Sequence, residues 1–207
     1  ENLVGLSQAP RSINWVGEYE GYRVDFVSAE IGPVCAALLR GDGNVLERVL
    51  NPLQLAESED LRRLRRVAEG SICRLYYNHY NDFARGLLKD HETNPTPTVR
   101  RVLQAYRTAL SGIHLLQTGE LLFHLPTLAH SYGQDRLEEL ISIARSDAEA
   151  RLPEGSHWIN HLARLHQALE KAANESPLPA DPPNAAEVED YLLDMRRRFF
   201  DAHTVQF

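Results

Sequence analysis

The chain has 207 residues, of which 43% are hydrophobic, and this is enough for one large domain with a real core. Its net charge of −7 excludes a general polyanion binder, so any phosphate site has to be a local basic patch. The sequence has no apolar run as long as a membrane span and no signal peptide, so no membrane partner is expected.

The two cysteines, Cys35 and Cys73, lie far apart in the chain, each within an apolar run. Such residues are typical of core positions in proteins of a reducing compartment. We therefore expect two reduced core thiols in a cytoplasmic protein.

The first thirty residues predict a β-hairpin. Residues 11–19 are typical of a strand, Glu20 and Gly21 of a turn, and residues 22–28 of the returning strand. In the second strand the side chain of Asp25 points to the face opposite the aromatic residues. Because strand interiors are usually poor in Asp, this carboxylate is a candidate functional residue.

The remainder of the chain predicts helices. They are expected over residues 31–40, 45–50, 57–70, 71–88, 99–118, 134–150, 156–174 and 185–200. Residues 91–98 predict a loop, and the proline-rich residues 175–184 a stiff connector. The expected fold class is α+β and mostly helical, with a small β-hairpin followed by a helical bundle.

The helix expected over residues 99–118 carries a polar stripe on one face. The stripe consists of Arg100, Gln104, Arg107, Ser111 and His114. All five side chains can donate hydrogen bonds, and such a row suits an anion because guanidinium groups match phosphate oxygens. The alternative is a solvated face, or arginines that pair with acids on another helix. Spacing alone leaves both open and favours the second.

Single polar residues near this helix allow two interpretations each. His79 lies on an apolar stripe and is either a hydrogen-bonded core histidine or a ligand-binding residue. Tyr80 either packs in the core or provides a platform for a base or a sugar. Glu120 follows the helix end and either pairs with Arg107 or Arg100 or approaches a ligand.

Two further motifs are interpreted as surface features. His157 and His161 have the spacing of metal ligands, but Trp158 stands where a zinc-protease motif requires Glu, and no third ligand is evident. The arginine run in LRRLRRV is typical of a solvated basic face, because no aromatic residues alternate with the arginines.

Six segments occur in an order that resembles a known family. They are VDFVSAEI, RGDGNVLERVLNPL, NHYNDFARG, VLQAYRTALSGIHLLQTGEL, SPLPADPP and LLDMRRRF. The series resembles nucleotidyltransferases of the DNA polymerase beta superfamily, in the branch that includes the RNA-repair-associated polymerase-like proteins. The resemblance runs over essentially the whole chain. Its most specific parts are two segments, NVLERVLNP and AYRTALSGIHLLQTGEL.

The resemblance implies a catalytic role for Asp25. In that superfamily a paired-Asp motif and a third carboxylate on a later strand hold two magnesium ions, and Asp25 falls where the third carboxylate belongs. Asp25 is thus both a catalytic and a metal-ligand candidate, with Mg²⁺ and an NTP as expected cofactor and substrate. It is also the expected acceptor for the proton of the attacking hydroxyl.

Two motifs of the superfamily are missing from this sequence. GLSQAP is not the expected Gly-Ser motif, because no Asp-x-Asp follows it, and the chain starts at Glu1 rather than Met. We therefore expect a truncated chain that is inactive alone, since a single carboxylate binds Mg²⁺ weakly. Residues 1–30 would be the C-terminal part of a nucleotidyltransferase core, and residues 31–207 a helical region that binds substrate or nucleotide.

The resemblance also implies substrate-binding residues in the helical region. Tyr106 and Arg107 are expected to line the nucleotide or acceptor cleft, and Arg100 or Arg101 to lie near phosphates. The remaining candidates are His79, Tyr80, His114 and Glu120. The acceptor stays open between an RNA end, a protein side chain and a small molecule.

Three hypotheses for the function follow. The first is a Mg²⁺-dependent nucleotidyltransferase that carries Asp25 as a catalytic carboxylate. The second is a non-catalytic module of the same fold that holds a nucleotide or an RNA end in its helical cleft. The third is a helical scaffold whose arginine runs are solvent faces, and it predicts no stabilisation by nucleotides.

Overall fold

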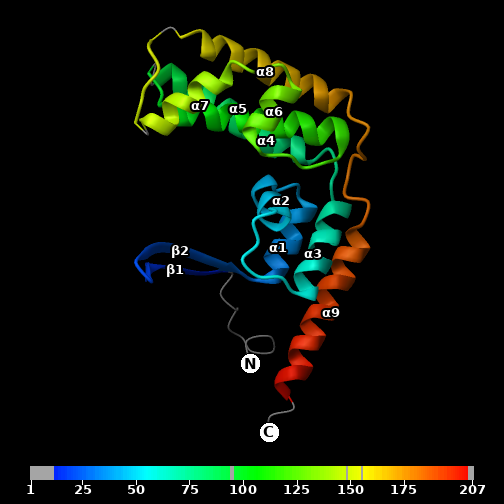
Figure 1. The fold of residues 1–207 in the computed structure, drawn as a ribbon. Coiled ribbons are helices and arrows are strands. Elements are labelled where there is room, and N and C mark those ends of the chain that lie inside the picture. Colours follow the sequence, from blue (N-terminus) through cyan, green and yellow to red (C-terminus); the bar gives the residue numbers. More distant parts are fainter. Residues whose placement is uncertain (1–11, 94–95, 148, 155, 205–207) are drawn as a thin grey trace.

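The computed structural model describes residues 12–93, 96–147, 149–154 and 156–204. Within these residues a two-stranded antiparallel hairpin is followed by helices in two groups, one above the other in Figure 1. This arrangement confirms the expected class, α+β and mostly helical. The division into domains at residue 30 stays a prediction.

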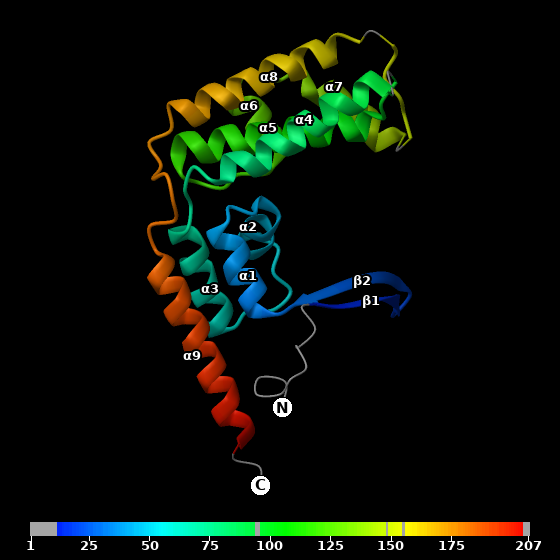
Figure 2. The same cartoon turned by 180° about the vertical axis from the view of Figure 1, so that it is seen from behind.

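The hairpin consists of β1 (Ser12–Tyr19) and β2 (Tyr22–Ala29). Glu20 and Gly21 form the turn with φ angles of 51° and 81°, and two positive φ values fit the right-handed twist of the flanking strands. Both Figure 1 and the opposite view in Figure 2 show the hairpin projecting sideways from the start of α1. The strands and turn agree with the prediction from the sequence.

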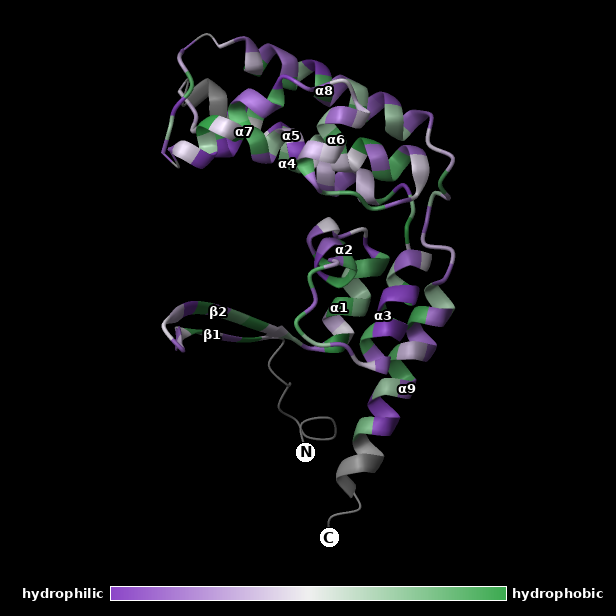
Figure 3. Cartoon of the chain, in the orientation of Figure 1, coloured by the Kyte–Doolittle hydropathy of each residue, from purple (hydrophilic) through white to green (hydrophobic). Residues whose placement is uncertain are grey.

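The hairpin exposes large hydrophobic side chains to solvent. They come from both strands and are Ile13, Trp15, Val16, Tyr19, Tyr22, Phe26 and Val27. The hydropathy colouring in Figure 3 shows this hydrophobic character along the hairpin. A single two-stranded hairpin is only marginally stable in water, so these side chains are suited to packing against a further layer.

The first group of helices consists of α1 (Ile31–Leu39), α2 (Gly43–Leu50), α3 (Glu59–Gly70) and α9 (Ala185–Thr204). Side-chain oxygens of Glu30, Asp42 and Ser58 accept hydrogen bonds from backbone N–H groups in the first turns of α1, α2 and α3. The last helix, α9, packs against α1 and α3 around Cys35 and Tyr191. The two ends of the described chain therefore share one small core.

The second group consists of α4 (Tyr76–Thr93), α5 (Val99–Thr118), α6 (Leu125–Ser131), α7 (Leu137–Ser146) and α8 (His157–Asn174). The central helix is α5, which contacts the other four. A Cβ atom at Gly112 of α5 would lie 2.7 Å from Tyr80 and 3.0 Å from Leu169. The absence of a side chain at Gly112 thus lets α4 and α8 approach α5 closely.

The two groups meet where α1 and α2 reach the start of α4. The buried hydroxyl of Tyr76 donates a hydrogen bond of 3.0 Å to the carbonyl oxygen of Leu38. At Gly41, with φ at 75°, a Cβ atom would lie 2.7 Å from the backbone carbon of Leu75. The connector after α8 returns past this point, because the Arg74 N–H donates to the carbonyl of Pro179 at 2.9 Å.

Several details differ from the sequence prediction. The helix predicted over residues 71–88 is α4 over Tyr76–Thr93, so residues 71–75 precede it and residues 91–93 belong to it rather than to the loop. The helix predicted over residues 134–150 is α7 over Leu137–Ser146. The short helix α6 was not predicted, because its seven residues span only about two turns, with Pro126 in the first one and no side-chain cap at His124. The sequence signals for a helix start are therefore weak at this position.

Both cysteines lie in the core with unpaired thiols, as predicted. Burial, together with the nearby carboxylate of Glu30, raises the pKa of the Cys35 thiol to about 11. Within the described residues no helix is both long and apolar enough to cross a membrane.

We expect Gly41→Ala to destabilise the protein because Gly41 combines a positive φ with a close backbone contact at Leu75. The expected loss in the free energy of unfolding is about 2–3 kcal/mol, measured by urea denaturation. Gly86→Ala in α4 is the matched control, since nothing lies within 4 Å of its Cβ position. The control is expected to gain about 0.5–1 kcal/mol from helix propensity. Equal stabilities of the two variants would contradict this account of the junction.

Candidate functional site

Asp25 lies in the middle of β2 with an exposed side chain. In the ladder it stands opposite Val16, and the neighbouring pair Glu18 and Arg23 shares its face of the hairpin. No hydrogen bond or ion pair of Asp25 is formed with the described residues. The carboxylate is therefore available to an external group, although an arginine two residues away provides a compensating charge.

The described residues do not by themselves fit a magnesium site. They contain no group of three or more His, Cys, Asp or Glu side chains placed to hold a metal ion. Mg²⁺ requires near-octahedral oxygen coordination and is usually held by one or two carboxylates together with substrate phosphates. Asp25 alone supplies one such ligand, so a metal at this position requires further ligands.

A polar cluster connects the two helical groups, and it contains two of the predicted residues. Arg107 of α5 donates to Glu47 of α2 with an Nη1 to Oε2 distance of 2.9 Å. Their side chains are 31% and 19% exposed, so the pair is shielded from solvent. Tyr80 of α4 is fully buried beside the pair. Burial raises the pKa of the Tyr80 hydroxyl, and the negative charge of Glu47 raises it further while Arg107 opposes this.

His79 also belongs to the contact between the two groups. Its ring lies directly over Gly43, the first residue of α2, where a Cβ atom would collide with the ring. The His79 and Tyr80 rings meet edge to face with centroids 5.1 Å apart. His79 is therefore a partly buried packing residue between α2 and α4, and its ring forms no hydrogen bond with the described residues.

The polar stripe of α5 divides into parts with different environments. Arg100 and Gln104 are exposed, Arg107 is paired with Glu47, and Ser111 is buried without a hydrogen-bond partner among the described residues. His114 is half-buried, with its Nδ1 atom 3.1 Å from the hydroxyl of Tyr132 on the C-terminal side of α6. The stripe is therefore not one continuous row of donors for an anion.

The two ends of α5 carry the remaining exposed candidates. Arg100 and Arg101 lie in the first turn, where the backbone N–H of Arg101 donates to Thr98. Glu120 lies just beyond the other end and is exposed. A helix of this length separates the two ends by roughly 30 Å. A pairing of Glu120 with Arg100 is therefore wrong, and the carboxylate that pairs with Arg107 belongs to Glu47.

Tyr106 lies in the core of the second group. It has no exposed surface, its hydroxyl donates to the carbonyl of Trp158 at 3.2 Å, and the two rings meet edge to face at 6.0 Å. The expectation that Tyr106 lines a cleft is therefore corrected to a role in core packing. Its strict helical spacing with apolar residues of α5 is the signal that indicated a buried position.

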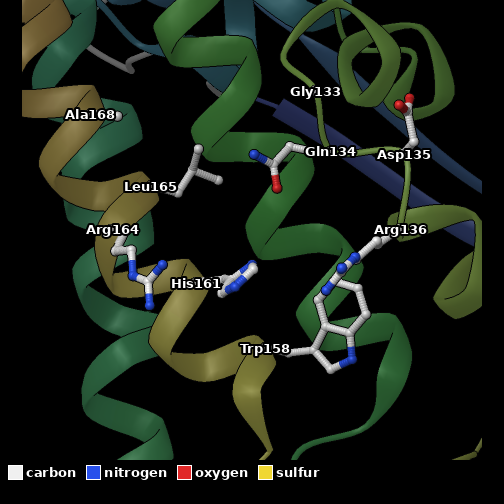
Figure 4. Close-up of a pocket in the computed structure, with 9 residues that line it drawn as sticks. All are labelled: Gly133, Gln134, Asp135, Arg136, Trp158, His161, Arg164, Leu165 and Ala168. Atoms are coloured by element: carbon white, nitrogen blue, oxygen red, sulfur yellow. The ribbon is translucent and has the colours of Figure 1, made fainter.

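The sequence analysis missed a pocket between α8 and the segment that joins α6 to α7. The pocket has a volume of about 580 Å³. Figure 4 shows its described lining residues, which are Gly133, Gln134, Asp135, Arg136, Trp158, His161, Arg164, Leu165 and Ala168. We call it the basic pocket. His161 and Arg164 share a face of α8 by spacing, but only the fold brings Arg136 beside them.

Comparison with known proteins gives one family and one curated relative. A family model described as the RNA repair pathway DNA polymerase beta family matches residues 21–194. Uncharacterized protein MJ0002 of Methanocaldococcus jannaschii is 31% identical over 98 residues. That alignment covers 47% of this chain, and the chain spans only 40% of the relative's length. No solved structure gives a significant match.

We expect the ion pair between Arg107 and Glu47 to stabilise the contact between the two helical groups. In a double-mutant cycle of Arg107→Ala and Glu47→Ala, each single variant is expected to lose roughly 1–3 kcal/mol of unfolding free energy. The expected coupling is about 1 kcal/mol, because the pair is shielded from solvent. It is measured by urea denaturation at two salt concentrations.

The exposed pair of Arg62 and Glu59 is the matched control for this cycle. Solvent and salt screen these side chains, so their cycle is expected to give no measurable coupling. An Arg107–Glu47 coupling as small as that of the control would show that the pair does not hold α2 to α5.

Proposed function

Because this chain belongs to the RNA repair pathway DNA polymerase beta family, we propose that it takes part in nucleotidyl transfer from an NTP to an acceptor. In this reaction an acceptor hydroxyl attacks the α-phosphorus of the NTP. The bond from the α-phosphorus to the bridging oxygen breaks, and pyrophosphate leaves with the electron pair. The nucleoside monophosphate stays on the acceptor.

The observation that carries the proposal is the position of Asp25. Asp is uncommon in the middle of a strand, and this one is exposed and makes no ion pair with the described residues. We propose that Asp25 receives the proton of the attacking hydroxyl. Magnesium bound with the NTP is part of the proposal, although the described residues do not complete a metal site.

The exposed first turn of α5 supports a role in holding phosphate. Arg100 and Arg101 both extend from this turn, and guanidinium groups bind phosphate oxygens through paired hydrogen bonds. The helix that carries this turn is held in place by contacts with α2. Arg107 of α5 pairs with Glu47 of α2, and Tyr80 and His79 of α4 pack beside that pair and against Gly43. The family description favours an RNA end as the acceptor over a protein or a small molecule.

We expect Asp25→Asn to reduce nucleotidyl transfer by at least about a hundredfold in the complete gene product, because the amide cannot accept the proton. The assay follows transfer of a labelled nucleoside monophosphate to RNA, with and without a chelator of divalent cations. Removal of Mg²⁺ is expected to abolish the activity of the unchanged protein as well.

Glu20→Gln is the matched control for this assay. Glu20 is an exposed acid in the turn of the same hairpin, so the change removes the same charge from a position outside the proposed site. Its activity is expected to stay within about twofold, since the exposed turn contributes no reacting group. Equal activity of Asp25→Asn and the control would refute the role of Asp25.

A second candidate function is a non-catalytic module that binds a nucleotide or an RNA end. It is favoured by the finding that the described part of the chain contains no cluster of three acidic or other metal-binding side chains. A binding module is expected to gain thermal stability from NTP, because a ligand that binds only the native state stabilises it. The gain is expected to be equal with Mg²⁺ and with a chelator, because such binding does not need the metal. Transfer activity that depends on Mg²⁺ would exclude this alternative.

A further inference from the structure

The basic pocket combines an apolar wall with cationic side chains at its rim. Trp158, Leu165 and Ala168 provide the wall from one face of α8. In Figure 4 the Gln134 amide and the His161 ring point toward the space between α8 and the segment before α7. A volume of about 580 Å³ lies in the range of pockets that hold small organic ligands.

The two arginines of the basic pocket form no ion pair with the described residues, as is also true of several other arginines. Arg63, Arg107 and Arg196 each form an ion pair with a carboxylate. By contrast, Arg136 and Arg164 form no ion pair or hydrogen bond through their side chains within the described residues. In a chain with a net charge of −7, two such cations at one pocket are a local excess of positive charge.

The acidic residue among the described lining residues does not neutralise this charge. The carboxylate of Asp135 lies 3.5 Å from Nδ1 of His130, a residue that does not line the pocket. Figure 4 shows the Asp135 side chain pointing away from Gln134, His161 and Arg136. The pocket therefore presents cations and amide donors without a competing anion from Asp135.

The positive charges around the basic pocket also affect the pKa of His161. Partial burial lowers the pKa of His161, and the positive charges of Arg164, His157 and Arg136 lower it further. Asp135 is the acid that lines this pocket, and it faces His130. An anion bound between the arginines would oppose these effects and raise the pKa of His161.

We propose that the basic pocket is a binding site for the phosphate monoester of a nucleotide. Arg136 and Arg164 bind the phosphate oxygens, because guanidinium groups match them in geometry and charge. The Gln134 amide and the wall formed by Trp158 and Leu165 contact the sugar or base. The nucleotide is either free or the phosphorylated end of a strand. This site does not depend on Asp25 or on transfer activity.

The proposal is tested by fluorescence titration with AMP, inorganic phosphate and a 5′-phosphorylated oligoribonucleotide at constant ionic strength. Trp158 lines the pocket and Trp15 is the other tryptophan, so a Trp15→Phe background isolates the signal. AMP is expected to bind at least about tenfold more tightly than inorganic phosphate, which lacks the organic part. A strand end that binds more tightly than AMP identifies the strand as the source of the phosphate.

Arg136→Gln and Arg164→Gln are each expected to weaken AMP binding at least about tenfold. The matched control is Arg145→Gln, because Arg145 is exposed on α7 and does not line the pocket. This control is expected to bind AMP within about twofold of the unchanged protein, since Arg145 does not touch the ligand. All three arginine positions are exposed, so melting temperatures are expected to stay unchanged.

Three results would overturn the proposal. They are no AMP or strand-end binding at millimolar concentration, equal binding of inorganic phosphate and AMP, and equal weakening by Arg145→Gln and the pocket variants. Failure of Asp25→Asn to lose transfer activity would leave these binding results intact.

Discussion

The hydrogen bond from the Tyr76 hydroxyl to the carbonyl of Leu38 is the contact on which the helical architecture depends. The Tyr76 side chain is fully buried, with Ser71 Oγ 3.3 Å from the same hydroxyl, and burial raises the pKa of Tyr76. The same carbonyl also accepts a hydrogen bond from the backbone N–H of Gly41 at 3.1 Å, so the Tyr76 hydroxyl finds a buried acceptor there and links the end of α1 to the start of α4. This contact, with Gly41 close to Leu75, places α2 against α4 and so brings Glu47 to Arg107.

The arginines of this fold differ in whether they form an ion pair. Some bind a carboxylate of another helix, and others, such as Arg100 and Arg145, form no ion pair with the described residues. Arg63 and Arg107 use theirs to hold helices together, from α3 to α9 and from α5 to α2. Arg136 and Arg164 make no such pair in the described part of the chain, although they lie in the same fold. What sets these two arginines apart is that both line the basic pocket.

The hairpin is related to the helices in a different way. It emerges directly before α1 and exposes hydrophobic residues on both strands, whereas the helices bury theirs in two cores. The family match starts at the turn of this hairpin and continues into α9, so it includes Asp25 together with both helical groups.

The sequence by itself determined the hairpin, most helix boundaries and the two core cysteines, because turns, caps and periodicity depend on neighbouring residues. Ser58 caps α3 and Gly119 ends α5 as predicted. Only the tertiary structure decided which polar residues are paired. Arg107 and Glu47 are 60 residues apart, and Arg136 meets Arg164 only across two elements. Such contacts depend on how helices pack, and no local pattern encodes that packing.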